Sequence, residues 1–182
     1  MKRLLILPLL AALVVFSCKK DPIIDNQDLE PITFNFPDTL EFAVSSLVGL
    51  NIPWVIPSVA VTTGFQENVG GLDPLVSAVE DITLQSLDLE VISPPGLEFD
   101  WLKHITLFVN APGEPQVELA HLFDIPDGSG TRISLEPAPN LLDEYVKSED
   151  FTLDAQITVD ELLLQDIQLR VYMDFEVTLI NN

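Results

Sequence analysis

The sequence predicts an antiparallel all-β fold, and two observations support this. In residues 151–159 and again in 167–179, apolar and polar side chains alternate strictly. Such alternation gives a strand one apolar and one wetted face, as in an antiparallel sheet. Upstream, short apolar segments recur roughly every 8 to 15 residues between turns, a spacing typical of small β-proteins. Together these features predict an antiparallel β-sandwich, immunoglobulin/fibronectin-like, with one or two short helical turns.

The two C-terminal strands cannot be stable by themselves. Burial contributes at most about 1.5 to 3 kcal/mol per apolar side chain, whereas ordering each backbone residue costs about 1 to 2 kcal/mol. The rest of the chain must therefore cover their apolar face. Their connection, residues 161–166, has no Asn-Gly or Asp-Gly turn, so we expect it to cross between sheets. The run 167–179 would span about 43 Å as one strand, and we expect a bend or bulge in it.

The first predicted strands lie in residues 32–36 and 40–47, separated at Pro37. Residues 51–63 contain two prolines, each of which removes a hydrogen-bond donor from a sheet. This third segment is therefore expected to be an edge strand or an irregular extended segment.

Residues 73–79 begin with Asp-Pro, which are favourable at the cap and first position of a helix, and predict one or two helical turns. Residues 81–92 alternate, but the phase shifts by one residue within the segment. A shift of this kind predicts a strand with a β-bulge near Ser86.

Residues 104–110 and 116–123 flank a Pro-Gly turn and predict a hairpin. In the second strand, Val117, Leu119, His121 and Phe123 are expected to share one face. Residues 131–135 predict a short strand and 140–147 a helical turn.

The N-terminus has the three parts of a secretory signal. Lys2 and Arg3 precede an apolar run, residues 4–16, and the small Ser17 precedes Cys18. The run is too short for a stable transmembrane helix. We therefore assign residues 1–17 to a lipoprotein signal peptide, 18–31 to a flexible tether poor in apolar residues, and 32–182 to a single domain.

Residues 15–18, Val-Phe-Ser-Cys, resemble the bacterial lipobox, in which the cysteine is lipidated and becomes the new N-terminus. Phe16 departs from the small residue usual there, and an ordinary secreted protein is the alternative. With the following Lys-Lys-Asp, the segment is similar to outer-membrane lipoproteins of the Bacteroidota. In the sorting systems that this resembles, Asp after the cysteine retains a protein in the inner membrane, whereas here Lys19 follows. The resemblance implies a palmitate-type lipid anchor on Cys18 and residence in the outer membrane, on the periplasmic side or at the cell surface.

The charge restricts the possible partners. The formal net charge is −21, from 29 acidic and 8 basic residues. Removal of Lys2 and Arg3 with the signal would leave 6 basic residues and a charge of −23. Nucleic acid is excluded as a partner, because its binding depends on a basic surface. Cys18 is the only cysteine, so there is no internal disulfide and no cysteine zinc cluster.

No catalytic constellation is evident. The sequence has no nucleophile elbow, phosphate loop or dinucleotide motif. His104 and His121 lack metal-ligand spacing, and we interpret His121 as a hydrogen-bonded core or edge residue. Residues 124–130 have the composition of a calcium loop without its alternating ligands, and a plain turn is favoured. We therefore predict no enzyme activity, no cofactor and no metal site.

The two tryptophans are the candidate ligand contacts. Trp54 lies between prolines in the expected edge segment, and Trp101 follows a proline-rich loop. Exposed aromatic rings on loops stack on sugars or anchor protein partners, although core packing of either ring is favoured.

Residues 102–109 and the short strands resemble small all-β lipoproteins of the Bacteroidota, a resemblance that implies no activity. We expect a non-enzymatic, membrane-anchored binding or structural module of the cell envelope, with a protein or glycan partner. The alternative is a carbohydrate-binding accessory lipoprotein of a glycan-uptake system.

Overall fold

Eight antiparallel strands and two short helical elements make up the part of the chain that the computed structural model describes, residues 32–62, 79–148 and 150–179. The strands are β1 (Ile32–Val44), β2 (Trp54–Thr62), β3 (Val79–Ser93), β4 (Leu102–Asn110), β5 (Val117–Phe123), β6 (Arg132–Pro137), β7 (Asp150–Val159) and β8 (Ile167–Leu179). The helical elements are the 3-10 turn η3 (Phe99–Trp101) and the single helical turn α2 (Asp143–Val146).

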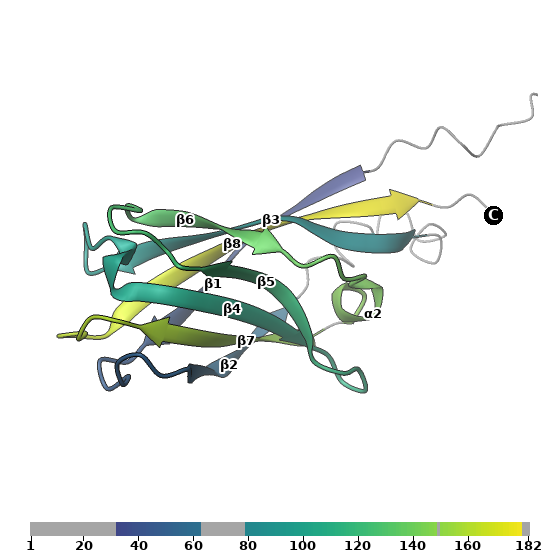
Figure 1. Cartoon of the computed structure of the whole chain (residues 1–182). Coiled ribbons are helices and arrows are strands. Elements are labelled where there is room, and N and C mark those ends of the chain that lie inside the picture. Colours follow the sequence, from purple (N-terminus) through teal and green to yellow (C-terminus); the bar gives the residue numbers. More distant parts are fainter. Residues whose placement is uncertain (1–31, 63–78, 149, 180–182) are drawn as a thin grey trace, which may run out of the picture.

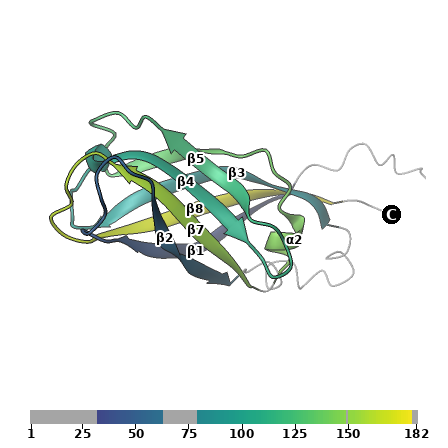
Figure 2. The ribbon, with the colours of Figure 1, turned by 60° about the horizontal axis from the view of Figure 1, so that its bottom comes forward.

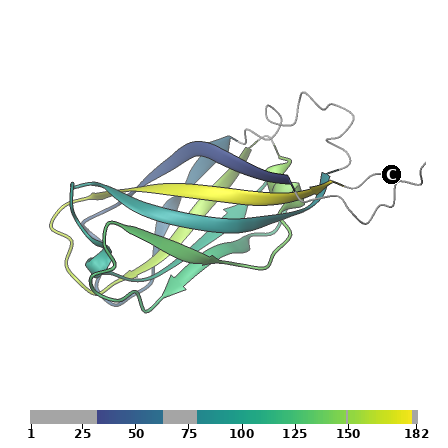
Figure 3. The same ribbon diagram turned by 90° about the horizontal axis from the view of Figure 1, so that it is seen from above.

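The strands form one continuous sheet in the order β1-β8-β3-β6-β5-β4-β7-β2. The sheet turns at β6, which is hydrogen-bonded to β3 on one side and, through two residue pairs, to β5 on the other. As a result the first half (β1, β8, β3, β6) faces the second half (β5, β4, β7, β2), as seen in Figures 1 and 3. The apolar faces of both halves meet in a single core.

The antiparallel all-β fold predicted from the sequence is confirmed. Its strand order, however, is that of a jelly roll: β1 pairs with β8, β2 with β7, β3 with β6 and β4 with β5. The first four strands thus pair with the last four in reverse order. An immunoglobulin domain has two separate sheets, whereas here hydrogen bonds join all eight strands in one sheet. The immunoglobulin-like arrangement expected from the sequence is therefore not the one observed.

Alternation correctly identifies the buried face of the C-terminal strands. In β7 the side chains from Phe151 to Val159 are buried at every second position, and in β8 the same holds from Ile167 to Val177. The two strands do not pair with each other, since β7 lies between β4 and β2 whereas β8 lies between β1 and β3. The connection between them therefore crosses from one half to the other, as expected.

Irregularities in register lie close to the predicted positions. The bulge expected near Ser86 is confirmed, because Leu84 pairs with Phe175 and Ser86 with Asp174, leaving one extra residue in β3. The bulge expected in β8 is instead found in its neighbours, where the extra residues belong to β1 and β3.

Three other expectations concern single elements. Two strands are predicted at residues 32–36 and 40–47, but residues 32–44 form the single strand β1, whose register shifts between Phe36 and Leu40. Residues 45–47 lie in the connection that follows it. The edge strand expected at residues 51–63 is β2, at one end of the sheet order. The helical turn expected at residues 140–147 is α2. The helical turn predicted at 73–79 falls on residues 73–78, which lie outside the described residues, as do Cys18, the signal and the tether.

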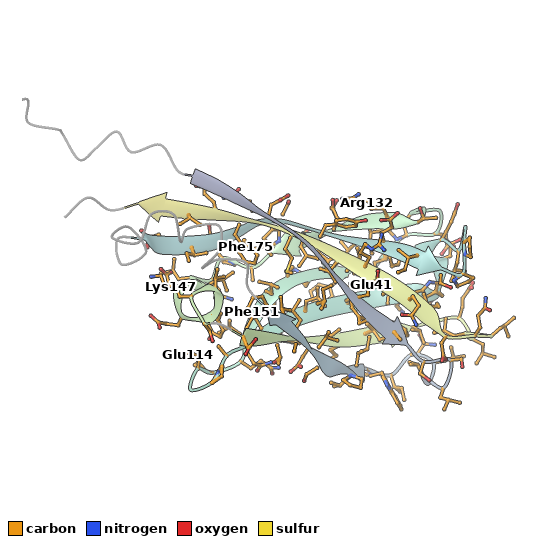
Figure 4. All side chains as sticks on the ribbon, turned by 180° about the vertical axis from the view of Figure 1, so that it is seen from behind. Glu41, Glu114, Arg132, Lys147, Phe151 and Phe175 are labelled. Atoms are coloured by element: carbon orange, nitrogen blue, oxygen red, sulfur yellow. The ribbon has the colours of Figure 1, made fainter. Side chains whose placement is uncertain are left out.

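The two ends of the fold differ. At one end, β1 begins opposite the last residues of β8, where Ile32 pairs with Val177. Helix α2 lies at this end, where Phe151 and Phe175 border the same small space beneath it, and Figure 4 shows Lys147 and Glu114 close by. The other end, described below, carries four connections. Within the described residues, no helix is long and apolar enough to cross a membrane.

Candidate functional site

The end of the fold away from the start of β1 is built from the four connections that lead out of β1, β3, β5 and β7. They are residues 45–53, 94–101, 124–131 and 160–166. We call this surface the loop end; it lies on the left in Figures 1 and 2. The strands bring these connections together because every strand pair is antiparallel, so alternate connections fall at the same end.

Hydrogen bonds tie the four connections in a row. The amide of Phe99 donates to the carbonyl oxygen of Gly130 at 2.9 Å, and the amide of Asp160 donates to that of Trp101 at 3.2 Å. At the far side, Ser46 donates to Asp166 from its amide at 2.8 Å and from its hydroxyl at 3.0 Å. The loop end is therefore a connected surface and not four independent loops.

A pocket of about 320 Å³ opens between the connections 94–101 and 160–166. Most of its wall is apolar, from aliphatic side chains and one indole ring, and three carboxylates complete it. The lining side chains are Leu97, Glu98, Asp100, Trp101, Glu161, Leu162, Leu163, Leu164, Gln165 and Ile167. Its size is at the low end for small-molecule pockets.

Trp101 forms part of the pocket wall from within the core. Its side chain is 3% exposed and stacks on Phe99, with ring centroids 6.1 Å apart. The indole Nε1–H makes no hydrogen bond within the described part of the chain. A buried donor left unpaired costs about 1 to 3 kcal/mol, and this nitrogen lies beneath the surface of the pocket wall.

Exposed apolar side chains are concentrated at the loop end. Among the side chains whose burial the structure describes, which leaves out those of residues 32–39, 62, 79–80 and 178–179, nine large hydrophobic ones are exposed. Eight of these lie in the connections of the loop end or at the adjoining strand ends: Leu47, Leu50, Ile52, Trp54, Val55, Phe123, Leu162 and Leu164. The ninth, Leu141, lies beside α2 at the opposite end. Leu164 is 95% exposed and Leu162 is 71% exposed. Exposed apolar groups gathered on one surface mark an interaction site.

The charge of the loop end is of one sign. Its four connections contain seven carboxylates and no Lys, Arg or His: Glu98, Asp100, Asp124, Asp127, Asp160, Glu161 and Asp166. Three basic side chains of the described residues are paired with carboxylates outside these connections, as Arg132–Asp88, Lys147–Asp143 and Arg170–Glu41. Lys103, the second residue of β4 and next to the loop end, is in none of these ion pairs. Figure 4 shows Arg132 and Glu41 on the first half of the sheet.

His121 lies on an outer face and not on the apolar face predicted for it. Leu119 is an extra residue in β5, because Leu107 pairs with Ala120 and Phe108 with Glu118. This bulge reverses the alternation, so Ala120 is buried while His121 and Phe123 turn outward. His121 Nδ1 lies 2.7 Å from a carboxylate oxygen of Glu118, which agrees with the expected hydrogen-bonded histidine.

His104 and His121 both contact the ring of Phe123, at centroid distances of 5.8 and 4.6 Å. In residues 124–130, Ser129 donates to the carbonyl oxygen of Pro126, and the amide of Gly128 donates to Asp100 at 2.6 Å. These are the contacts of a structured turn. Among the described residues, no group of three or more His, Cys, Asp or Glu is placed to hold a metal ion.

The two candidate tryptophans have different environments. Trp54 is 40% exposed at the start of β2, whereas Trp101 is buried and lines the pocket. Only Trp101 borders the pocket. Leu162 and Leu164 are not among the contacts predicted from the sequence, although three leucines in succession in a connection without turn residues break the usual polar pattern of loops.

Comparisons with known proteins give no family assignment. No family model matches the chain, and no curated protein matches it. Among solved structures, the chain is similar to the structure of infectious bursal disease virus Gt strain, with 9% identity and a TM-score of 0.39 over 96% of this chain and 38% of that one. It is also similar to empty-head turnip yellow mosaic virus (ATC), with 13% identity and a TM-score of 0.24 over 100% of this chain and 91% of that one.

Proposed function

We propose that the protein is a non-enzymatic binding module of the cell envelope, anchored in the outer membrane by acyl chains on Cys18, and that it binds its partner with the loop end. The anchor rests on the lipobox-like segment before Cys18. The binding role rests on one observation: of the nine large hydrophobic side chains that are exposed among those whose burial is described, eight lie at that end.

The direction of the chain supports this assignment of roles. Strand β1 begins at the end opposite the loop end and follows the expected tether. Thirteen residues of β1 at about 3.3 Å each separate the two ends by roughly 40 Å. A protein held at Cys18 would therefore be attached at the end opposite the loop end, and the flexible tether would leave the loop end free to meet a partner.

A protein partner fits the loop end better than a glycan. Sugar recognition by stacking needs an exposed flat ring, and the tryptophan in the pocket wall is buried. Trp54 is an exposed indole, but its neighbours in the exposed set are mostly Leu, Ile and Val. Aliphatic side chains bury well against another protein and offer no hydrogen bonds to sugar hydroxyls. The carbohydrate-binding alternative is therefore the second outcome of the test and not the main proposal.

Site-specific photo-crosslinking in cells tests the proposal. A photoreactive amino acid replaces either Leu162 at the loop end or Leu141, the exposed leucine at the opposite end. We expect a discrete crosslinked protein from position 162 and none from position 141. Equal crosslinking from both positions, or none from position 162, contradicts the proposal. Retention of the wild type on a polysaccharide that is lost in Trp54→Ala would support the glycan alternative.

A further inference from the structure

We propose that the pocket beside Trp101 holds a lysine or arginine side chain of the partner protein, and that aliphatic residues flanking this side chain pack on Leu162 and Leu164. This inference rests on the proposed function and adds the chemistry of the partner segment. It follows from the composition of the pocket, the charge of the loop end and the connections that hold the pocket in shape.

The pocket combines two features that few ligands match at once. Leucine, isoleucine and indole surfaces form most of its wall, and Glu98, Asp100 and Glu161 add three carboxylates. Lysine and arginine have an aliphatic stem that packs on apolar surface and a cationic head that remains near water or a carboxylate. A purely apolar side chain would leave the carboxylates without a positive charge beside them, and a small cation would leave the apolar wall exposed.

The volume agrees with an occupant of this size. A pocket of about 320 Å³ is at the lower limit for drug-sized ligands and suits a long side chain with some adjoining backbone.

Charge selects among the possible occupants. A second copy of the chain would bring seven more carboxylates against the seven of the loop end, and like charges brought together in an interface are unfavourable. An anionic lipid surface would be repelled for the same reason. Arg132, Lys147 and Arg170 already form ion pairs, and Lys103, the second residue of β4, is a single positive charge beside the seven carboxylates of the connections. Most of the neutralising charge at the loop end therefore has to come from the partner.

Peptide binding to the whole chain after the signal, carrying Cys18→Ser to keep it in solution, tests the inference. The probe is a fluorescent peptide, Ser-Gly-Leu-Lys-Leu-Lys-Leu-Gly-Ser, followed by anisotropy at low ionic strength. One control peptide has Gln for both Lys, and another has Ser for every Leu. We expect both controls to bind at least about tenfold more weakly, a difference of about 1.4 kcal/mol.

Matched double variants locate the binding site. The pocket variant is Glu161→Gln with Leu162→Ser, and the control variant is Glu144→Gln with Leu141→Ser, which removes the same groups from exposed positions at the opposite end. We expect the pocket variant to bind the peptide about tenfold more weakly and the control variant to bind like the wild type. Because all four residues are at the surface, unchanged melting temperatures will show that both variants are folded.

Three results would overturn the inference. The first is that both double variants bind the lysine peptide equally weakly, which would mean non-specific attraction to an acidic protein. The second is that the Gln peptide binds as tightly as the lysine peptide. The third is that the wild type forms a concentration-dependent dimer, or binds phosphatidylglycerol vesicles, and that the pocket variant abolishes this. The proposed function is judged separately. If position 162 crosslinks to an envelope protein while the lysine peptide does not bind, the loop end is the binding surface and the basic side chain is not its ligand.

Discussion

The carboxylate of Asp166 accepts two hydrogen bonds from Ser46, one from the amide and one from the hydroxyl, across 120 positions of sequence. This contact joins the connection after β7 to the connection after β1, which carry most of the exposed apolar side chains of the loop end. The two connections come from opposite halves of the sheet. Holding them together therefore fixes the shape of the proposed binding surface.

This contact predicts an acid-sensitive contribution to stability. The hydrogen bonds from Ser46, the amide first and then the hydroxyl, lower the pKa of Asp166 from its ordinary value of 3.8. A carboxylate whose pKa is lowered in the folded state stabilises the fold above its unfolded pKa and loses that contribution as the pH falls through the folded value. We expect Asp166→Asn to lower the urea midpoint at about pH 7 and to make little difference near about pH 2 to 3.

The control for this experiment is Asp127→Asn, which removes one negative charge from the same end of the molecule. If both substitutions change the urea midpoint equally at every pH, general charge is responsible and the Ser46 contact contributes nothing specific.

A second prediction concerns the core. Phe175 is 2% exposed, lies in β8 and borders the space beneath α2 together with Phe151. Removing a buried phenylalanine side chain loses its burial and leaves a cavity, so Phe175→Ala is expected to cost about 3 to 5 kcal/mol in the free energy of unfolding. Phe123→Ala removes the same group from an exposed position and is expected to cost about 1 kcal/mol. Chemical denaturation measures both, and similar losses would mean that the faces of β8 are wrongly assigned.

The sequence predicts the strands better than it predicts their pairing. Alternation depends on which face of a strand is buried, and it predicts the buried side chains correctly at each described position of β7 and β8. It carries no information about which strand lies alongside. The long connection between β7 and β8 indicated a crossing because it lacks tight-turn residues, but the jelly-roll order also depends on pairings such as Ile32 with Val177, whose partners lie far apart in the sequence.

The candidate site is predicted less completely. Aromatic content directs attention to Trp54 and Trp101, yet composition cannot distinguish a ring at a strand start from one sealed beneath a loop. A single extra residue, Leu119, reverses the face of His121, and such a bulge leaves little trace in the local pattern. The pocket itself arises from two connections that are adjacent only after folding.

A third prediction separates the two tryptophans by solvent access. In Trp54→Phe the only tryptophan emission comes from Trp101, which is 3% exposed, and in Trp101→Phe it comes from Trp54, which is 40% exposed. We expect acrylamide to quench the first variant weakly and the second strongly, with the emission of the first at shorter wavelength. Because a smaller phenyl ring replaces the buried indole and leaves a cavity, Trp101→Phe should also melt earlier than Trp54→Phe. Equal quenching of both variants would contradict the burial of Trp101.

The last prediction concerns the anchor. A single acyl chain gives only marginal, reversible membrane binding, since each buried methylene contributes about 0.8 kcal/mol, whereas two or more chains hold a protein stably. If Cys18 is lipidated, the wild-type protein should fractionate with the outer membrane and carry the mass of its acyl chains, and Cys18→Ala should appear in the soluble fraction or remain as unprocessed precursor.

Cys18 precedes the first described strand, β1, so a released, processed Cys18→Ala protein should keep the wild-type circular dichroism spectrum and urea midpoint. The lysine-containing peptide should also bind that released protein as it binds the Cys18→Ser form, because the loop end lies at the opposite end of the fold from the start of β1. An unmodified mass for the wild type, together with membrane association that survives Cys18→Ala, would reject the lipid anchor while leaving the loop-end proposal to its own crosslinking test.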